Sequence, residues 1–205
     1  MSLLSDVPQV SVSPLVRRVP VAADSEGYDC CELSTAYGLR PFDWQRTALI
    51  DTMGVREDGR WAAPRGGWSV ARQNGKNGGA EMFEVHVTAM LGMRVLHSAH
   101  EVKTARKAFK RLLDFFDNPR RYPELAALVK EIRRTNGQEA IELHNGGSVE
   151  FLARTKASGR GYSADILLLD EAQELTDDEL EAMQPTISAS QNPMLFLMGT
   201  PPRPD

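Results

Sequence analysis

The segment ILLLDEAQ, residues 166–173, constrains the fold more than any other part of the chain. Its run of apolar residues leaves no polar face, which is typical of a strand covered on both sides in a parallel sheet. Such a sheet needs helices on its faces, and segments with helical periodicity alternate with the other predicted strands. The sequence therefore predicts a layered α/β fold. Its ligand should lie at the carboxyl ends of the strands, where Asp170 and Glu171 follow the apolar run.

Periodicity divides the rest of the chain into alternating elements. Helices are predicted where apolar residues recur at helical spacing, over residues 42–53, 80–91, 101–117, 123–134 and 176–185. Strands are predicted at residues 68–71, 94–99, 166–170 and 194–199, and a hairpin at residues 140–153, where two alternating runs flank Asn145-Gly146-Gly147. Residues 1–35 are rich in Pro and Ser without a sustained period, so we expect an extended or partly disordered arm there.

Composition limits the environment and the partners. With 205 residues, 41% of them hydrophobic, the chain can bury one sizeable core. A formal net charge of −4 gives no general attraction to nucleic acid, so any contact with phosphates would need a local basic patch. The adjacent Cys30 and Cys31 form no metal-ligand or disulfide framework, which favours a reducing, intracellular setting. No segment approaches the roughly 20 apolar residues of a membrane span, so we expect a soluble protein without membrane contact.

A second chemical feature is the segment SVARQNGKN, residues 69–77, between a predicted strand and a predicted helix. In that setting backbone N–H groups and a helix N-terminus surround phosphate oxygens, and Lys76 would reach the outer phosphates. The common pattern G-x-x-x-x-G-K-[ST] is broken at Val70 and at Asn77. By itself the segment is equally compatible with a loop that carries a solvent-exposed lysine.

The acidic pair after the apolar strand supplies the other half of a nucleotide site. In phosphate-loop ATPases the first acid holds Mg²⁺ and the second activates the attacking water, which assigns Asp170 to the metal and Glu171 to the general base. Asn77 could be a further metal ligand through its amide oxygen, or could mark a loop that turns nucleotide over slowly. Arg72 could neutralise the charge that develops on the γ-phosphate, or could pair with Asp170 or Glu171.

With ARQNGKN and ILLLDEAQEL both placed, the chain resembles the ATPase domain of the large terminase subunit of tailed bacteriophages, the motor that drives DNA into the procapsid. The family's loop, [SAP]-R-[QK]-x-G-K-[STN], implies that Arg72 is a catalytic arginine acting in cis. The resemblance covers residues 37–205 and leaves residues 1–36 as an N-terminal arm. It implies a RecA-like P-loop NTPase fold, a three-layer sandwich with a mostly parallel sheet and an added catalytic-glutamate strand, truncated on its C-terminal side.

The same resemblance implies roles for other residues. LRPFDWQ resembles the adenine-recognition segment, which places Gln45 at the adenine edge and Trp44 or Phe42 near the ring. GTPP resembles the coupling motif, in which Thr200 would sense the γ-phosphate. The loop RTKASGRGYSAD makes Arg160 a candidate for phosphate or DNA contact. The implied site comprises catalytic Arg72, Lys76 and Glu171, metal ligands Asp170 and Asn77, and nucleotide-binding Trp44, Gln45, Arg72, Gln73, Asn74, Gly75, Lys76, Asn77, Gly78 and Thr200.

The resemblance also implies the cofactors and the partners. ATP and Mg²⁺ would power translocation of viral double-stranded DNA, together with the portal protein, the small terminase subunit and further copies of the chain in a ring. The motor would act in the cytoplasm of the infected bacterium, docked on the procapsid portal. The lid and the nuclease domain of the family have no counterpart in the sequence, so we expect a fragment of a longer product.

DNA contact has one local candidate, and two other functions stay open. Lys103, Lys107 and Lys110 share one face of a predicted helix, with Arg106 and Arg111 beside them, which fits either DNA phosphates or a solvated helix face. A helicase-like ATPase is disfavoured because no second ATPase-like domain is present. A nucleotide-binding module with little or no turnover is the other alternative.

Overall fold

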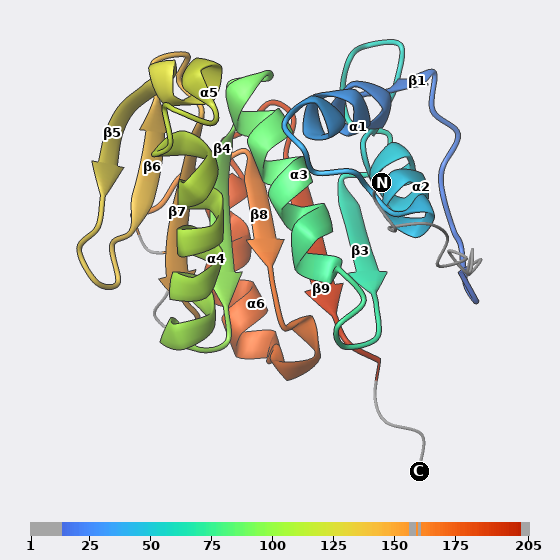
Figure 1. The fold of residues 1–205 in the computed structure, drawn as a ribbon. Coiled ribbons are helices and arrows are strands. Elements are labelled where there is room, and N and C mark those ends of the chain that lie inside the picture. Colours follow the sequence, from blue (N-terminus) through green and yellow to red (C-terminus); the bar gives the residue numbers. More distant parts are fainter. Residues whose placement is uncertain (1–13, 156–158, 160, 202–205) are drawn as a thin grey trace.

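The computed structural model describes residues 14–155, 159 and 161–201. Within these residues a seven-stranded sheet has the order β3-β9-β8-β4-β7-β6-β5 (Figure 1). The strands are β3 (Arg65–Ser69), β4 (Arg94–Ala99), β5 (Val129–Arg133), β6 (Ala140–Leu143), β7 (Ser148–Ala153), β8 (Ile166–Leu169) and β9 (Met194–Gly199). The pairs from β3 to β7 are all parallel, and β6 and β5 extend one edge in antiparallel fashion. The sheet is therefore mostly parallel, as predicted.

Helices and short 3-10 turns cover the two faces of this sheet. The helices are α1 (Gly27–Ala36), α2 (Asp43–Thr52), α3 (Lys76–Ala89), α4 (Val102–Phe116), α5 (Pro123–Ala127) and α6 (Asp177–Met183), with 3-10 turns η1 (Ala172–Glu174) and η2 (Gln184–Ile187). A separate two-stranded ribbon joins β1 (Asp24–Ser25) to β2 (Gly54–Val55). In Figure 1, α3 and α4 lie in front of the central strands. None of the helices in the described ranges is long and apolar enough to cross a bilayer.

Alternation along the central strands separates two apolar clusters. Ile166 and Leu168 pack with residues of α3 and α4, whereas Leu167 and Leu169 pack with Met183 of α6 and its neighbours. Successive strand side chains point to opposite faces, so β8 is buried from both sides. All four of its residues are fully buried, which confirms the prediction from the apolar run.

The helix after the predicted phosphate-binding segment begins earlier than predicted. The apolar period indicates a start at residue 80, but α3 begins at Lys76, directly after the loop. Gly78 and Gly79 are poor helix formers and have no apolar side chain, so they hide the first turn from a periodicity analysis. Trp68 of β3 packs where a side chain at position 79 would lie: a Cβ there would be 2.8 Å from the indole ring.

The predicted extended arm is wrong for its last part, because residues 27–36 form helix α1. Cys30 and Cys31 are 0% and 1% exposed and belong to the main core. Gly27 allows α1 to approach α2 closely, since a Cβ there would lie 2.4 Å from the Cα of Ile50. Two cysteines and a glycine give little amphipathic signal, so packing on α2 and α3 decides this helix rather than local periodicity.

The prediction of one helix over residues 123–134 is also wrong in its second half. Helix α5 ends at Ala127, and the chain continues as β5, which pairs antiparallel with β6. A register shift between Val129 and Glu131 lets Val129 and Ile132 both pack against the core despite their helix-like spacing. Pairing with β6 therefore overrides the local pattern.

Candidate nucleotide-binding site

The segment between β3 and α3 has the backbone of an anion-binding loop. Gly75 has a φ of 84° and Gln73 a φ of 63°, so two left-handed residues turn the chain into α3. Among the described residues, no side chain caps the N-terminus of this 14-residue helix. Its first N–H groups therefore lack both intrahelical partners and a side-chain acceptor. A helix end of this kind attracts phosphate oxygens.

Lys76, the first residue of α3, lies in contact with the acidic end of β8. Its ammonium forms an ion pair with the carboxylate of Asp170, and the two side chains are only 14% and 4% exposed. Burial acts most strongly and raises the pKa of Asp170, but the Lys76 ammonium, together with other favourable contacts such as the Glu171 N–H, holds that pKa below its ordinary value. The two motifs, 94 residues apart in sequence, thus meet at one point of the fold.

Glu171 follows in a strained conformation beside this pair. Its φ of 53° and ψ of 45° are left-handed, which is unfavourable for a residue with a side chain. Its N–H donates to Asp170 Oδ1 at 2.8 Å, and its Oε1 accepts from Thr104 Oγ1 at 3.4 Å. Among the described residues, its buried Oε2 has no hydrogen-bond partner. One carboxylate oxygen is therefore free to accept a proton or a water molecule.

The segment predicted to recognise adenine lies against the predicted phosphate loop. Gln45 is 2% exposed; its Nε2 donates to the Gly75 carbonyl at 2.8 Å, and its Oε1 accepts from the Phe42 N–H at 2.7 Å. Trp44 packs edge-on against Trp68, with ring centroids 6.0 Å apart. Phe42 is 47% exposed, so it is the aromatic ring of this segment that a base could reach. In this structure both ends of the Gln45 amide bond to the protein, at Phe42 and at Gly75 of the loop. Contact of Gln45 with adenine therefore stays a prediction.

The remaining predicted residues occupy the same end of the sheet. Arg72 is exposed and forms no ion pair within the described ranges, so its proposed pairing with Asp170 or Glu171 is absent. The Val70 N–H donates to the Gly199 carbonyl at 3.1 Å, which places Thr200, the next residue, beside the start of the loop. Gln73, Asn74 and Asn77 are exposed on the loop and on the first turn of α3, and Gly78 is half-buried there. Arg160 lies outside the described residues.

Solved structures show what this arrangement is similar to. The large terminase of bacteriophage HK97 matches with a TM-score of 0.69 at 18% identity, over 85% of this chain and 38% of that one. The large terminase ATPase domain of Thermus phage P74-26 matches with a TM-score of 0.61 at 19% identity, over 85% of this chain and 70% of that domain. The chain has the fold of a large terminase ATPase domain. The predicted RecA-like fold and the predicted resemblance are therefore confirmed.

The extent of this likeness is limited in two ways. The chain spans 38% of the length of the HK97 large terminase that it matches. No protein-family model matches the chain, and no curated protein matches it. At 18% and 19% identity the likeness concerns the terminase ATPase fold, and the roles of individual residues must come from the geometry of this chain.

The site residues of this terminase-like domain fit a nucleoside triphosphate with Mg²⁺. The uncapped N-terminus of α3 provides donors for phosphate oxygens, and the free Glu171 Oε2 faces no other partner in the described chain. The described residues hold no group of three or more His, Cys, Asp or Glu side chains that could bind a metal. Mg²⁺ at nucleotide sites usually takes only one or two carboxylates beside phosphate oxygens and water. Asp170 could supply a carboxylate oxygen, and Asn77 could add an amide oxygen.

Two residues that contact Glu171 were not among the predicted site residues. Thr104 lies in the first turn of α4 and reaches the carboxylate, and Arg154, after β7, donates to the Glu171 carbonyl at 3.1 Å. Thr104 belongs to no recognisable motif, and Arg154 is the first residue of the loop RTKASGRGYSAD, in which only Arg160 was a candidate. Tertiary structure decides both contacts, because α4 and β7 meet the carboxyl end of β4, next to β8.

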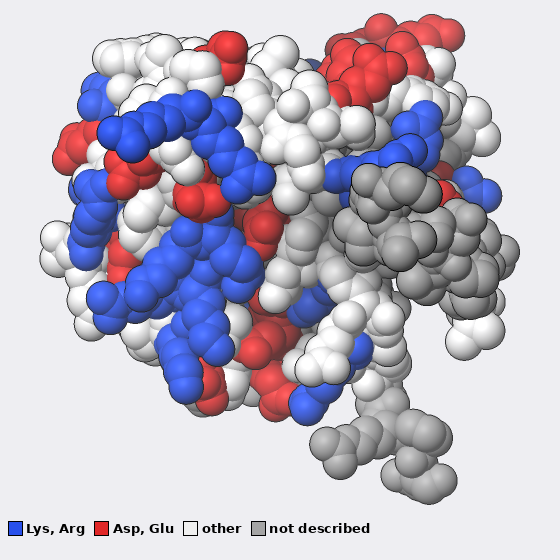
Figure 2. Space-filling view, viewed as in Figure 1, with Lys and Arg blue, Asp and Glu red and all other residues white. Residues whose placement is uncertain are grey.

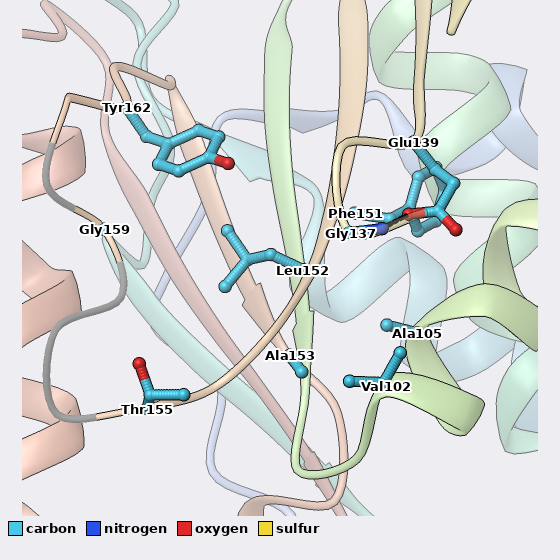
Figure 3. Close-up of a pocket in the computed structure, with 10 residues that line it drawn as sticks. All are labelled: Val102, Ala105, Gly137, Glu139, Phe151, Leu152, Ala153, Thr155, Gly159 and Tyr162. Carbon is cyan, nitrogen blue, oxygen red and sulfur yellow. Dashed lines mark hydrogen bonds between the residues drawn. The ribbon is translucent and has the colours of Figure 1, made fainter. Parts of the chain in front are cut away.

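A cavity of about 330 Å³ lies near the first turn of α4 (Figure 3). Val102 and Ala105 of α4, Phe151 of β7 and Tyr162 are among the residues that line it. Figure 3 shows Tyr162 on one side of this space and Glu139 on the other. None of the lining residues belongs to the predicted nucleotide site, so the cavity is separate from the phosphate loop.

Proposed function

We propose that the chain is the ATPase part of a large terminase, a Mg²⁺-dependent enzyme that hydrolyses ATP to move viral double-stranded DNA into a procapsid. The observation that carries this proposal is the contact of Lys76 with Asp170 beside the uncapped N-terminus of α3. A lysine, a buried carboxylate and free helix N–H groups at one point make a site for phosphates and a cation.

Each residue has a distinct role in the proposed reaction. The N–H groups at the start of α3 bind phosphate oxygens. The Lys76 ammonium leaves the Asp170 carboxylate and binds the outer phosphates. Asp170 and Asn77 hold Mg²⁺, which when bound neutralises charge on the phosphates. Glu171 accepts the proton of the attacking water through its free oxygen, and Arg72 neutralises the charge that develops on the transferred group.

The experiment is a Mg²⁺-dependent phosphate-release assay combined with nucleotide binding by fluorescence. We expect Lys76→Ala to lose both binding and turnover, and Glu171→Ala to keep binding while turnover falls at least 100-fold. Lys130→Ala is the matched control, because Lys130 is an exposed lysine on β5 at the far edge of the sheet. Equal phosphate release from wild type and both site variants would refute the enzyme. Binding without turnover in the wild type would favour a nucleotide-binding module.

The proposed partner, double-stranded DNA, has a candidate surface on α4. Figure 2 shows basic side chains gathered over this helix. Lys103, Arg106, Lys107 and Lys110 are exposed, and none of them forms an ion pair within the described residues. Arg111 differs, because it pairs with Glu81 of α3. Four unpaired cations on consecutive turns of one helix face suit the phosphates of a duplex.

DNA binding is tested by salt dependence. Replacing Lys103, Lys107 and Lys110 together by Gln should reduce the slope of log affinity against log salt by roughly 0.9 for each phosphate that the variant no longer neutralises. The control is a second triple variant that removes the same charge from the β5 edge of the sheet. It replaces Lys130, Arg133 and Arg134 by Gln. Equal slopes for the two triple variants would exclude α4 as the DNA-binding surface. Assembly on a portal, with a small subunit and in a ring in the infected cell, belongs to the same proposal.

A further inference from the structure

Arg154 is a buried arginine that no part of the proposed reaction uses. It is 4% exposed, and among the described residues it forms no ion pair with a carboxylate. Burial lowers the pKa of its guanidinium, and the surrounding acids Glu179, Glu171 and Asp170 act in the opposite direction. A guanidinium taken out of water without a paired acid is costly, so its hydrogen bonds must carry its role.

Within the described part of the chain, those hydrogen bonds go to backbone carbonyls at the carboxyl edge of the sheet. Arg154 follows β7, and its own N–H donates to Ala99 at the end of β4 at 2.8 Å. Its Nη1 donates to the carbonyls of Ser98 at 3.1 Å and Asp170 at 2.6 Å, and its Nη2 donates to that of Glu171 at 3.1 Å. The side chain therefore spans β4 and ties the end of β7 to the end of β8.

The left-handed conformation of Glu171 explains why one guanidinium can serve two successive residues. In a helical turn of either hand, neighbouring carbonyls point in about the same direction, so those of Asp170 and Glu171 face Arg154 together. The planar fork of an arginine matches two parallel acceptors, which a lysine ammonium cannot do with the same geometry. The Glu171 N–H donates to Asp170 Oδ1, the oxygen that also binds Lys76.

We propose that Arg154 is a positioning residue that holds Glu171 in its left-handed turn and thereby places its carboxylate beside Asp170. This inference rests on the proposed ATPase function. Among the described residues Arg154 forms no ion pair with either carboxylate, and its hydrogen bonds to residues 170 and 171 go to their backbone carbonyls. Loss of the fork lets residue 171 relax toward ordinary backbone angles and moves the general base away from the attacking water.

The test compares Arg154→Lys and Arg154→Met with the control Arg133→Lys, a half-buried arginine that pairs with Glu142 and Glu150 at the other edge of the sheet. We expect both Arg154 variants to lower kcat at least tenfold, with nucleotide affinity within twofold of wild type. Amide hydrogen exchange at Glu171, followed by NMR, should become at least tenfold faster. The control should change none of these three quantities.

One further measurement separates positioning from simple stabilisation and from failure of the ATPase proposal. Glycine adopts left-handed angles without strain, so in a Glu171→Gly background Arg154→Lys should lower the urea midpoint by less than half as much as in the wild type. Neither this comparison nor amide exchange depends on ATP hydrolysis. Both therefore test the positioning role of Arg154 even if the wild type does not hydrolyse ATP. An unchanged kcat in folded Arg154→Lys, unchanged exchange at Glu171, or an equal midpoint decrease in both backgrounds overturns the inference.

Discussion

Removing the ammonium of Lys76 should destabilise the nucleotide-free protein through Asp170. Lys76→Met keeps most of the aliphatic stem but leaves a carboxylate that is 4% exposed, with the Glu171 N–H as its one remaining hydrogen bond in the described chain. Breaking a fully buried ion pair costs about 3–5 kcal/mol. The Lys76 side chain is 14% exposed and lies beside an open loop, so solvent replaces part of the interaction. We expect the free energy of unfolding to fall by about 2 kcal/mol at pH 7.5.

The pH dependence gives this prediction its sign. In the wild type, the depressed pKa of Asp170 contributes stability above the unfolded value of about 3.9, and this is lost as the pH falls through the folded pKa. In the variant, burial acts without the ammonium, so the pKa of Asp170 moves above its ordinary value. The folded variant then takes up a proton more readily than the unfolded chain. Its deficit relative to wild type should therefore shrink as the pH is lowered from 7.5 toward 4.5.

Urea unfolding at pH 7.5, 6.0 and 4.5, with linear extrapolation, measures how far the free energy of unfolding of Lys76→Met lies below that of the wild type. Adding Asp170→Asn to Lys76→Met removes the unpaired charge and should restore at least half of the missing stability. Lys130→Met, at an exposed position on β5, should stay within about 0.5 kcal/mol of wild type. A deficit below about 0.5 kcal/mol at pH 7.5, or one that grows on acidification, would refute the reasoning.

Two other predictions test the packing of α1. Gly27→Ala should lower the free energy of unfolding by about 2 kcal/mol, because the added Cβ would lie 2.4 Å from the Ile50 Cα; Gly66→Ala, with its nearest neighbour atom at 3.8 Å, is the control in the same urea titration. Cys30 and Cys31 are 0% and 1% exposed, and burial raises the pKa of both thiols, so an aromatic disulfide reagent at pH 8 should modify neither in the native state and both in guanidinium. Rapid native modification, or equal stability of the two glycine variants, would contradict a docked α1.

The parts of the fold that were predictable from sequence are those in which neighbouring residues carry the whole signal. The capping box is one case: Thr176 accepts from the Glu179 N–H, and the Glu179 carboxylate accepts from the Thr176 N–H, as their spacing predicts. The fully buried β8 is another, because an uninterrupted apolar run has no stable place outside a covered sheet. The contact of Lys76 with Asp170 can be inferred once the parallel sheet is predicted, since both residues follow the carboxyl ends of parallel strands.

Tertiary structure decided the elements whose stability comes from distant partners. Helix α1 has a weak apolar pattern and depends on its contact with α2, and β5 depends on pairing with β6 against a local helical spacing. The contacts of Glu171 with Thr104 and Arg154 are of the same kind, because they join residues 67 and 17 positions apart. The sequence by itself indicated the groups for which we propose the chemistry. Only the packed sheet brought the strand ends together, and that alone decided which side chains contact the strained turn at Glu171.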